Sequence, residues 1–435
     1  MANGQSPDSS ALQKYGIPFY SAAWVPYKEL KSKLQSDDQA RSDDKREDSN
    51  KESATSAPAD KDGDSVDKEP SAAEPQKADG PAASEYYVVL AGGGGEGRSG
   101  IANAIVVAHF DFASSTLSPQ PVAKLVLGSE LPYRMAVHPK GDGLICAMQN
   151  SCRFFEWDEI EESETRKLDV KVSDKTLDLL QDVGQQLALA YDTDSSTLAV
   201  GGEVDSCFLL VFVQEGNLRI FKWPSMEVIL NEDQAHSSVK DLCFSPDGKF
   251  LVSLGSRGPG RVWDVPSAKV VASLPNGSDE VFFSCRFAQS RDNSLILYIA
   301  AITGKGGSIV TWNTSSWKRL RSKHVVRDSI SSFNVSPDGR LLAIGTTQGD
   351  VVVVDSSKLG VQMVVRKAHL GFVTALAFSH DSRALVSASM DSSARVTLIK
   401  EKKNGGLSWW IIILIILLAI LAYFLKEEGL LPDFD

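Results

Sequence analysis

Glycine is concentrated in one short stretch of the chain, residues 91–103, which has the sequence AGGGGEGRSGIAN. Successive glycines allow positive φ angles and expose amides and carbonyls to a ligand. Gly95, Gly97 and Gly100 match G-x-G-x-x-G, the spacing with which a loop holds a dinucleotide pyrophosphate. That chemistry requires a helix directly afterwards, whereas the sequence continues with the strand-like IVVAHFDF. Two interpretations remain: a flexible hairpin tip, or a loop that presents fixed polar groups to a partner.

Other catalytic and metal-binding signatures are missing from the sequence. It contains no G-K-[ST] phosphate loop, no paired CxxC and no HExxH, so we expect neither hydrolase, transferase nor zinc chemistry, and no required cofactor. The formal net charge of −11 argues against a nucleic-acid-binding surface, which needs basic stripes. The six histidines are scattered along the chain at His109, His138, His236, His324, His369 and His380.

A phrase recurs along the chain: a strand of alternating apolar residues, a tight turn with Pro-Asp-Gly or a relative of it, and a second strand. The clearest copies are VKDLCFSPDGKFLVSLG, ISSFNVSPDGRLLAIG and VTALAFSHDSRALVSAS. The residue that follows the first strand recurs at intervals of 43 to 54 residues, a period typical of the four-stranded blade of a WD-type β-propeller. We expect His236 and His369, just before two of these strands, to brace turns. The six marked positions are His138, Asp192, Ser245, Ala288, Ser336 and Ser379.

These six copies begin after residue 130, and a seventh blade can be assembled before them. Its first strand would lie at residues 21–26, its second at 86–91, its third at 101–112 and its fourth at 122–128. The last blade shows only three strands, so we expect a segment at residues 15–20 to supply its outer strand and close the ring. The predicted fold is therefore all-β: a seven-bladed WD-type β-propeller with a single C-terminal transmembrane helix.

A long acidic insertion interrupts the first blade. Residues 31–84 contain fourteen acidic and nine basic residues and no aromatic residue, so they cannot bury enough apolar surface to offset the entropy of ordering. We expect a disordered spacer, with a phosphorylated regulatory segment as the alternative. The predicted division is residues 1–30 for the N-terminal segment with the first propeller strands, 31–84 for the insertion, 85–400 for the cytosolic propeller, 401–406 for a linker, 407–425 for the transmembrane helix and 426–435 for a short lumenal tail.

Residues 407–425, LSWWIIILIILLAILAYFL, carry no charge, proline or glycine. As a helix they would extend about 28 Å, close to the hydrocarbon thickness of a bilayer. A buried core helix is the alternative, although nineteen uninterrupted apolar residues are unusual for one. Lys400, Lys402 and Lys403 lie on the propeller side and acidic residues predominate beyond the helix, which predicts a cytosolic body and a lumenal C-terminus. The five cysteines have irregular spacing, as expected for reduced core residues.

Taken together, a WD-type propeller, a C-terminal anchor and the motif GGGG-x-G-x-x-G-I-x-N resemble the Sec-twelve family of the endoplasmic reticulum. The resemblance implies a guanine-nucleotide exchange factor for a Sar-type small GTPase, which starts COPII coat assembly and transport from the endoplasmic reticulum to the Golgi. It also implies a GTPase-binding loop that a potassium ion orders through the backbone of Gly92, Gly93, Gly94 and Gly95. By the same resemblance, the loop's contact residues are Gly92, Gly93, Gly94, Gly95, Glu96, Arg98, Ser99, Ile101 and Asn103.

Two further functions stay open at this point. A plant branch of the family, the phosphate transporter traffic facilitators, resembles exchange factors but serves the export of particular transporters. The chain would then be a cargo-specific export factor with little or no exchange activity. A purely structural membrane scaffold is the third hypothesis, but it leaves the glycine loop unexplained. For the exchange factor, we expect Asn103 to bond the GTPase from an exposed position and Ile101 to fill an apolar notch on it.

Overall fold

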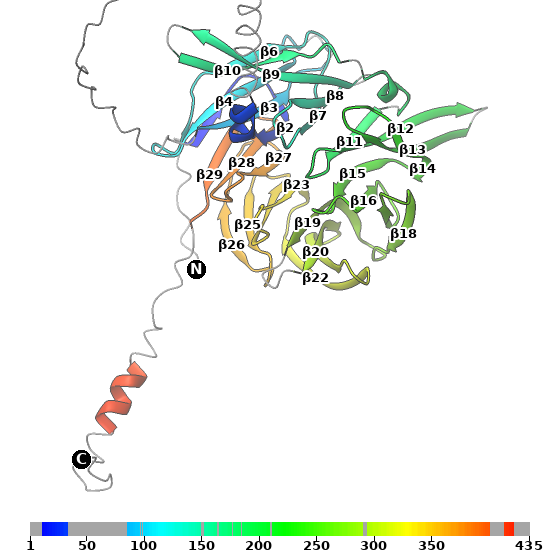
Figure 1. The fold of residues 1–435 in the computed structure, drawn as a ribbon. Helices are drawn as coiled ribbons and strands as arrows, with labels where there is room; N and C mark the ends of the chain where they lie inside the picture. The colour runs from blue at the N-terminus through cyan, green and yellow to red at the C-terminus, as the bar shows by residue number, and fades with distance from the viewer. Residues whose placement is uncertain are drawn as a thin grey trace, which may run out of the picture. The chain divides into compact units, whose positions relative to one another are not determined.

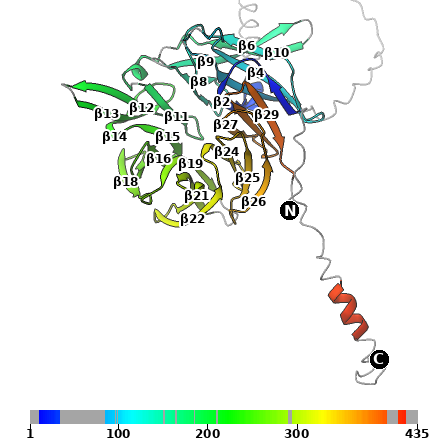
Figure 2. The same ribbon diagram turned by 180° about the vertical axis from the view of Figure 1, so that it is seen from behind.

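The computed structural model describes residues 11–33, 85–95, 97, 99–148, 152–162, 165–175, 177–183, 185–208, 211–289, 294–400 and 413–421. The chain divides into two compact units, Met1–Leu398 and Ile399–Asp435. The first unit contains seven antiparallel sheets arranged in a ring (Figures 1 and 2), which confirms the predicted seven-bladed propeller. Blade 1 consists of β2 (Phe19–Trp24), β3 (Tyr86–Gly92), β4 (Ala104–Asp111), β5 (Thr116–Leu117) and β6 (Ala123–Val126); both β5 and β6 pair with β4.

The next five blades follow in chain order, each with four strands. Blade 2 consists of β7 (Arg134–Val137), β8 (Leu144–Ala147), β9 (Cys152–Glu162) and β10 (Thr165–Val172), and blade 3 of β11 (Gln185–Tyr191), β12 (Thr197–Phe208), β13 (Val211–Lys222) and β14 (Val228–His236). Blade 4 consists of β15 (Val239–Phe244), β16 (Phe250–Gly255), β17 (Gly260–Asp264) and β18 (Lys269–Leu274), and blade 5 of β19 (Val281–Gln289), β20 (Leu295–Thr303), β21 (Gly306–Asn313) and β22 (Lys318–Val326). Blade 6 consists of β23 (Ile330–Val335), β24 (Leu341–Thr346), β25 (Val351–Asp355) and β26 (Val361–Val365). A 3₁₀ helix, η2 (Asp178–Val183), lies between blades 2 and 3.

The ring closes through the N-terminal end of the chain. Blade 7 combines β27 (Val373–Phe378), β28 (Ala384–Ser389) and β29 (Ser393–Leu398) with β1 (Leu12–Lys14), which pairs antiparallel with β29. The closing strand was expected at residues 15–20, and that position is wrong, because these residues cross from blade 7 to blade 1 and begin β2.

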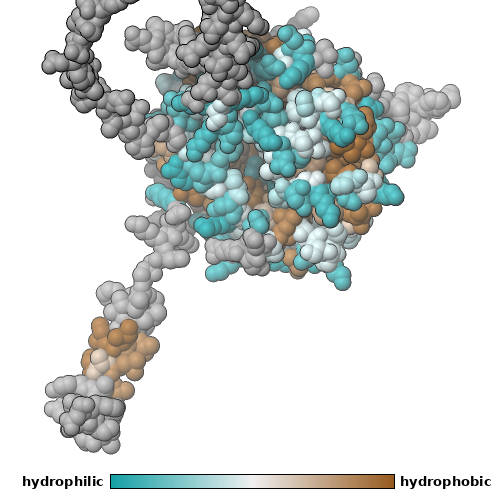
Figure 3. All heavy atoms as spheres, viewed as in Figure 1, coloured by the Kyte–Doolittle hydropathy of each residue, from teal (hydrophilic) through white to brown (hydrophobic). Residues whose placement is uncertain are grey.

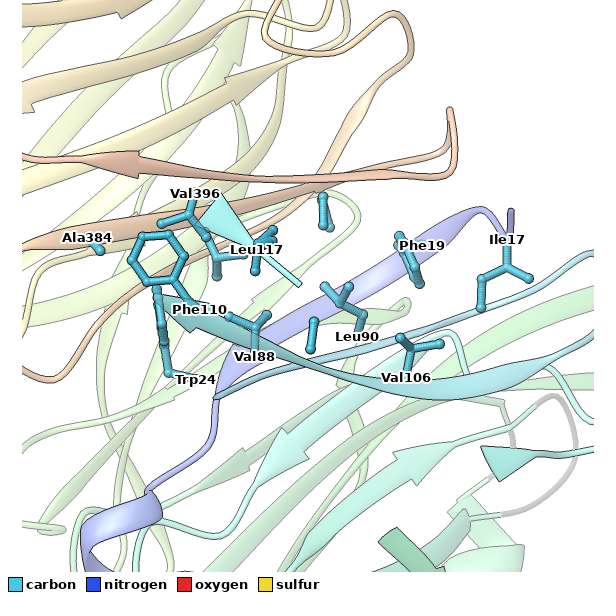
Figure 4. Close-up of a cluster of buried hydrophobic side chains, with 14 of the residues drawn as sticks. Ile17, Phe19, Trp24, Val88, Leu90, Val106, Phe110, Leu117, Ala384 and Val396 are labelled. Carbon is cyan, nitrogen blue, oxygen red and sulfur yellow. The ribbon is translucent and has the colours of Figure 1, made fainter. Parts of the chain in front are cut away.

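A shared apolar core holds blades 1 and 7 together (Figure 4). Phe19, Trp24 and Phe110 from blade 1 pack with Ala384 and Val396 from blade 7, and all are almost completely buried. The indole nitrogen of Trp24 also donates a hydrogen bond of 3.0 Å to the carbonyl of Ala377. Burial of several large side chains at this seam contributes about 1.5–3 kcal/mol each, which makes the closed ring the stable arrangement.

The recurring turn has the same chemistry in three blades. The hydroxyl of Ser245 accepts a hydrogen bond of 2.9 Å from the amide of Phe250, and Gly248 closes the turn with a φ of 68°. The hydroxyls of Ser336 and Ser379 likewise accept hydrogen bonds from the amides of Leu341 and Ala384. In these three blades, the serine after the first strand therefore helps to set the register of the hairpin.

The segment before the acidic insertion belongs to the propeller. Residues 27–33 form a helix, so three residues assigned to the insertion are ordered. Leu30 is buried on this helix and packs in the core of blades 1 and 2 beside Gly141. Residues 34–84 lie outside the described part of the chain.

The second unit is described only over residues 413–421, which form a helix. Its exposed side chains include Leu414, Ile416 and Leu421, and Figure 3 shows the segment as hydrophobic. Within the described residues, no helix is both long and apolar enough to cross a membrane. The linker, the tail and the rest of the predicted anchor, residues 401–412 and 422–435, lie outside the part described.

The two histidines expected to brace turns do so. His369 is buried and its ring nitrogens contact the hydroxyls of Ser393 at 2.6 Å and Ser387 at 2.8 Å. His236 shares the hydroxyl of Ser253 with the indole nitrogen of Trp263, each at 2.8 Å. Both histidines tie a loop to the strands behind it.

The brace at His236 predicts an acid-sensitive contribution to stability. Burial, reinforced by Arg261, lowers the pKa of His236 to about 4. In the unfolded chain the pKa of this histidine is near 6.5, so between pH 4 and 6.5 the unfolded state binds more protons than the folded state. The contribution of His236 to the free energy of unfolding is therefore fully present above pH 6.5 and is lost as the pH falls toward 4. Urea unfolding of the full chain in detergent at pH 7 and 4.5 should show an acid-induced loss about 2 kcal/mol smaller in His236→Gln than in the parent.

His324→Gln is the matched control, because His324 is exposed on β22. It should keep the parental pH dependence. Equal acid-induced losses in the parent and in His236→Gln would contradict the role of His236.

Candidate functional site

The glycine loop, residues 93–103, joins β3 to β4 in blade 1. At its start, the amide of Gly93 donates a hydrogen bond of 2.9 Å to the carbonyl of Pro18. At its end, the carbonyl of Asn103 accepts a hydrogen bond of 2.9 Å from the amide of Leu127. The two ends are thus tied to different segments of the blade, which restricts the motion of the loop between them.

Asn103 organises the interior of the loop. Its Oδ1 accepts a hydrogen bond of 2.9 Å from the amide of Gly95, and its Nδ2 donates to the carbonyls of Gly95 at 3.3 Å and Gly128 at 3.0 Å. The residue is only 1% exposed. The expectation of an exposed position for Asn103 is therefore wrong, because its side-chain amide is buried and bonded within the blade.

The glycines are required by this compact arrangement. A Cβ on Gly93 would overlap the side chain of Asn103, and one on Gly94 would overlap the hydroxyl of Ser99 and the side chain of Ile101. Gly95 has a φ of 77°, a conformation that side chains disfavour. A Cβ on Gly92, the last residue of β3, would overlap the carbonyl oxygen of Pro18. The run of glycines therefore lets the loop fold tightly over Asn103, which does not fit a flexible hairpin tip.

Ile101 is the apolar side chain that this loop exposes, with an exposed fraction of 39%. The hydroxyl of Ser99 accepts a hydrogen bond of 3.3 Å from the amide of Ile101 and orients the backbone there. Glu96 and Arg98 were also expected to contribute, but they lie outside the described residues. Among those described, the loop thus presents a surface of backbone groups around one aliphatic side chain.

The described residues of the loop are suited to binding and not to acid–base catalysis. Its described residues carry no titratable side chain, so they cannot act as general acids or bases. Within the described residues, no cluster of His, Cys, Asp and Glu could hold a metal ion. The loop does offer neutral backbone carbonyls, the ligands with which potassium-selective filters replace the hydration shell of the ion. Backbone carbonyls such as those of Gly92, Gly93, Gly94 and Gly95 are thus the type of ligand that a potassium ion takes, although the carbonyl of Gly95 also accepts a hydrogen bond from Asn103.

The central channel of the ring is less suitable than the glycine loop as a binding site for a partner. It has a volume of about 560 Å³ and is lined by the innermost strands of the blades. Its carboxylate Asp241 accepts hydrogen bonds from Arg286 at 2.7 Å, Ser284 at 2.7 Å and the amide of Cys285 at 2.8 Å. These groups satisfy one another and join blades 4 and 5, which is a structural role.

Sequence reasoning missed two partners of the loop, Pro18 and Gly128. Pro18 lies on the other side of the acidic insertion, and Gly128 follows β6. No spacing rule connects either residue with the glycine motif. Only the order of strands in the finished blade brings them together.

Comparisons with known proteins agree with the fold. Residues 360–397 match the family of the WD domain, G-beta repeat, and residues 208–315 match the anaphase-promoting complex subunit 4 WD40 domain. The chain is therefore a WD40 β-propeller protein.

Full-length similarity defines the family. The chain is 46% identical to SEC12-like protein 2 of Arabidopsis thaliana, over 90% of this chain and 89% of that protein. It is 31% identical to SEC12-like protein 1 of the same plant, over 68% of this chain and 70% of that protein. Guanine nucleotide-exchange factor SEC12 of Mus musculus is 26% identical over 50% of this chain and 56% of its own length. The chain belongs to the SEC12 family.

The buried amide of Asn103 leads to a stability prediction. Asn103→Ala leaves the amide of Gly95 and the carbonyl of Gly128 without partners, so the free energy of unfolding should fall by about 2 kcal/mol or more. Urea unfolding of the full chain in detergent measures this loss. Ser99→Ala, at an exposed loop position, should cost about 0.5 kcal/mol or less. Similar small losses in both variants would show that the Asn103 contacts contribute little.

Proposed function

We propose that this protein is a guanine-nucleotide exchange factor for a Sar-type small GTPase, which it would activate to start COPII coat assembly. The observation that carries the proposal is the glycine loop, which is held rigidly by Asn103 and exposes Ile101. The family adds support, because relatives from mouse and rat are named guanine nucleotide-exchange factors.

The proposed mechanism depends on differential binding. A factor accelerates nucleotide release only if it stabilises the nucleotide-free GTPase more than the nucleotide-bound form. A loop already fixed by hydrogen bonds to Pro18, Gly128 and Asn103 loses little conformational entropy when it engages a partner. Ile101 would enter an apolar notch of the GTPase, while neighbouring backbone groups bond polar atoms around it.

The loop backbone would also hold a potassium ion. The carbonyls of Gly92, Gly93, Gly94 and Gly95 would be its ligands, and the bound ion would supply positive charge that further orders the loop. Asn103 would support this arrangement from beneath, because its amide fixes both the amide and the carbonyl of Gly95.

A membrane location completes the proposal. Residues 407–425 would anchor the chain in the membrane of the endoplasmic reticulum with the propeller in the cytosol and the C-terminus in the lumen. The helix at residues 413–421, with its exposed aliphatic side chains, supports this assignment. The lysines before residue 407 and the acidic residues after 425 set the orientation.

A second candidate is favoured by the degree of similarity. The chain is more similar to the two plant proteins named SEC12-like than to the mouse protein named an exchange factor. A cargo-specific export factor, for example for phosphate transporters, would use the same fold and the same rigid loop without accelerating nucleotide release.

Nucleotide release separates the two candidates. The full chain in detergent should accelerate the release of fluorescent GDP from a purified Sar-type GTPase. Ile101→Ser should lower this acceleration about tenfold, because loss of a buried aliphatic contact costs roughly 1.4 kcal/mol or more. Val271→Ser is the control, since Val271 is exposed on β18 of blade 4 and should not matter. A parent chain without any acceleration would favour the export factor.

Replacement of potassium tests the cation. When lithium replaces potassium at equal ionic strength, exchange should slow several-fold and the melting temperature should fall by about 2 °C, because an ion bound only to the folded state stabilises it. The melting temperature is an independent readout of binding. Unchanged rates and melting temperatures in the two salts would contradict a potassium site.

A further inference from the structure

Three large apolar side chains are exposed together on blade 7. Leu370 and Phe372 lie in the loop between β26 and β27, with exposed fractions of 82% and 52%. Met390 lies in the turn between β28 and β29 and is 44% exposed. The amide of Met390 donates a hydrogen bond of 3.3 Å to the carbonyl of Phe372, which joins the two segments. We call these three residues the blade 7 patch.

The backbone beneath the patch is rigid. Asp391 accepts a hydrogen bond of 2.7 Å from the amide of Leu370 and another of 3.0 Å from the amide of Ser393. Burial opposes the ionisation of Asp391, but His369, Ser393 and the amide of Leu370 together hold its pKa well below the ordinary value. The loop thus has a hydrogen-bonded polar layer, which includes the buried His369 and Ser393, beneath an apolar outer surface. The side chains of Leu370 and Phe372 belong to none of the described core clusters, and their hydrogen bonds use backbone atoms alone, so the fold does not explain why these two residues are apolar.

A short segment connects the patch with the glycine loop. The amide of Tyr15 donates a hydrogen bond of 3.1 Å to the carbonyl of Ser392, two residues after Met390. Three residues later, the carbonyl of Pro18 accepts the hydrogen bond from Gly93. Four residues span at most about 14 Å when fully extended, so with the two hydrogen bonds the backbones of Ser392 and Gly93 lie within about 20 Å of each other.

One partner can cover both features. A standard protein interface buries about 800 Å² on each side, which corresponds to a disc roughly 30 Å across. The distance limit between the turn at Ser392 and the loop at Gly93 is smaller than that. Both connect the second and third strands of their own blades, β28 to β29 and β3 to β4, and therefore lie at the same end of neighbouring blades.

We propose that the blade 7 patch is a second contact for the small GTPase that engages the glycine loop. This inference rests on the proposed function. The partner would bring a complementary apolar area against Leu370, Phe372 and Met390, as in the apolar centre of stable interfaces. A lipid surface or a second copy of this chain would use the patch independently of the glycine loop, whereas continuity through residues 15–18 favours one protein partner that covers both.

The two contacts should differ kinetically. The patch lies beside the loop and would bind the GTPase equally well with and without nucleotide. Loss of such uniform binding raises KM and leaves kcat unchanged. Ile101, at the loop itself, would contribute to nucleotide release, so its loss should lower kcat.

The test compares four variants of the full chain in detergent, one of which is the Ile101→Ser variant described above. Leu370→Ser combined with Phe372→Ser should lower kcat/KM for GDP release from a Sar-type GTPase at least about tenfold, through KM, with a melting temperature within about 2 °C of the parent. Leu370→Met combined with Phe372→Leu keeps the apolar surface and should stay within about threefold of the parent. Val271→Ser is the control for loss of an exposed apolar side chain elsewhere.

Three results would overturn the inference. If the serine double variant keeps the parental kcat/KM while Ile101→Ser is impaired, the exchange function stands and the patch does not contact the GTPase. If the serine variant loses only self-association in sedimentation, the patch binds a second copy. If the parent does not accelerate release at all, the proposed function fails and this inference fails with it.

Discussion

Closure of the ring by the N-terminal end of the chain determines where the candidate binding surface can form. Strand β1 completes blade 7 by pairing with β29, and the chain then crosses directly into β2 of blade 1. The crossing residues 15–18 bond the β28–β29 turn at one end and the glycine loop at the other. Without this strand pairing, blade 7 would have an open edge and the loop would lose its support at Pro18. A seam that stabilises the fold therefore also aligns the two features proposed to bind a GTPase.

The glycine loop shows how a segment without reactive side chains can be a specific surface. Its glycines permit close packing around a buried asparagine, and that packing fixes which backbone groups and which side chain face outward. A preformed loop of this kind can discriminate between two states of a partner, because it does not adapt to both. Blade 7 follows the same principle, since the network of His369, Asp391 and Ser393 fixes a backbone that exposes apolar side chains.

Much of the fold could be predicted from local signals. Alternating apolar residues, the Ser-Pro-Asp-Gly turns and the period of 43 to 54 residues define the blades, because each hairpin is specified by neighbouring residues. The features that were missed depend on contacts between distant segments. The closing strand Leu12–Lys14 has too few residues to show a pattern, and the burial of Leu30 and Asn103 depends on segments brought together only in the closed ring. The loop itself could be identified because its run of glycines is a distinctive sequence feature, whereas Leu370 and Phe372 resemble any apolar pair in a β-rich sequence.

The central claim is that the glycine loop and the blade 7 patch form one GTPase-binding surface. Hydrogen–deuterium exchange of the full chain in detergent, with and without a nucleotide-free Sar-type GTPase, tests it most directly. The account predicts that exchange slows together in peptides covering residues 92–103, 366–372 and 390–392 when the GTPase is bound. Slower exchange confined to blades 3, 4 and 5, or no change in any of these peptides at saturating GTPase, would contradict it.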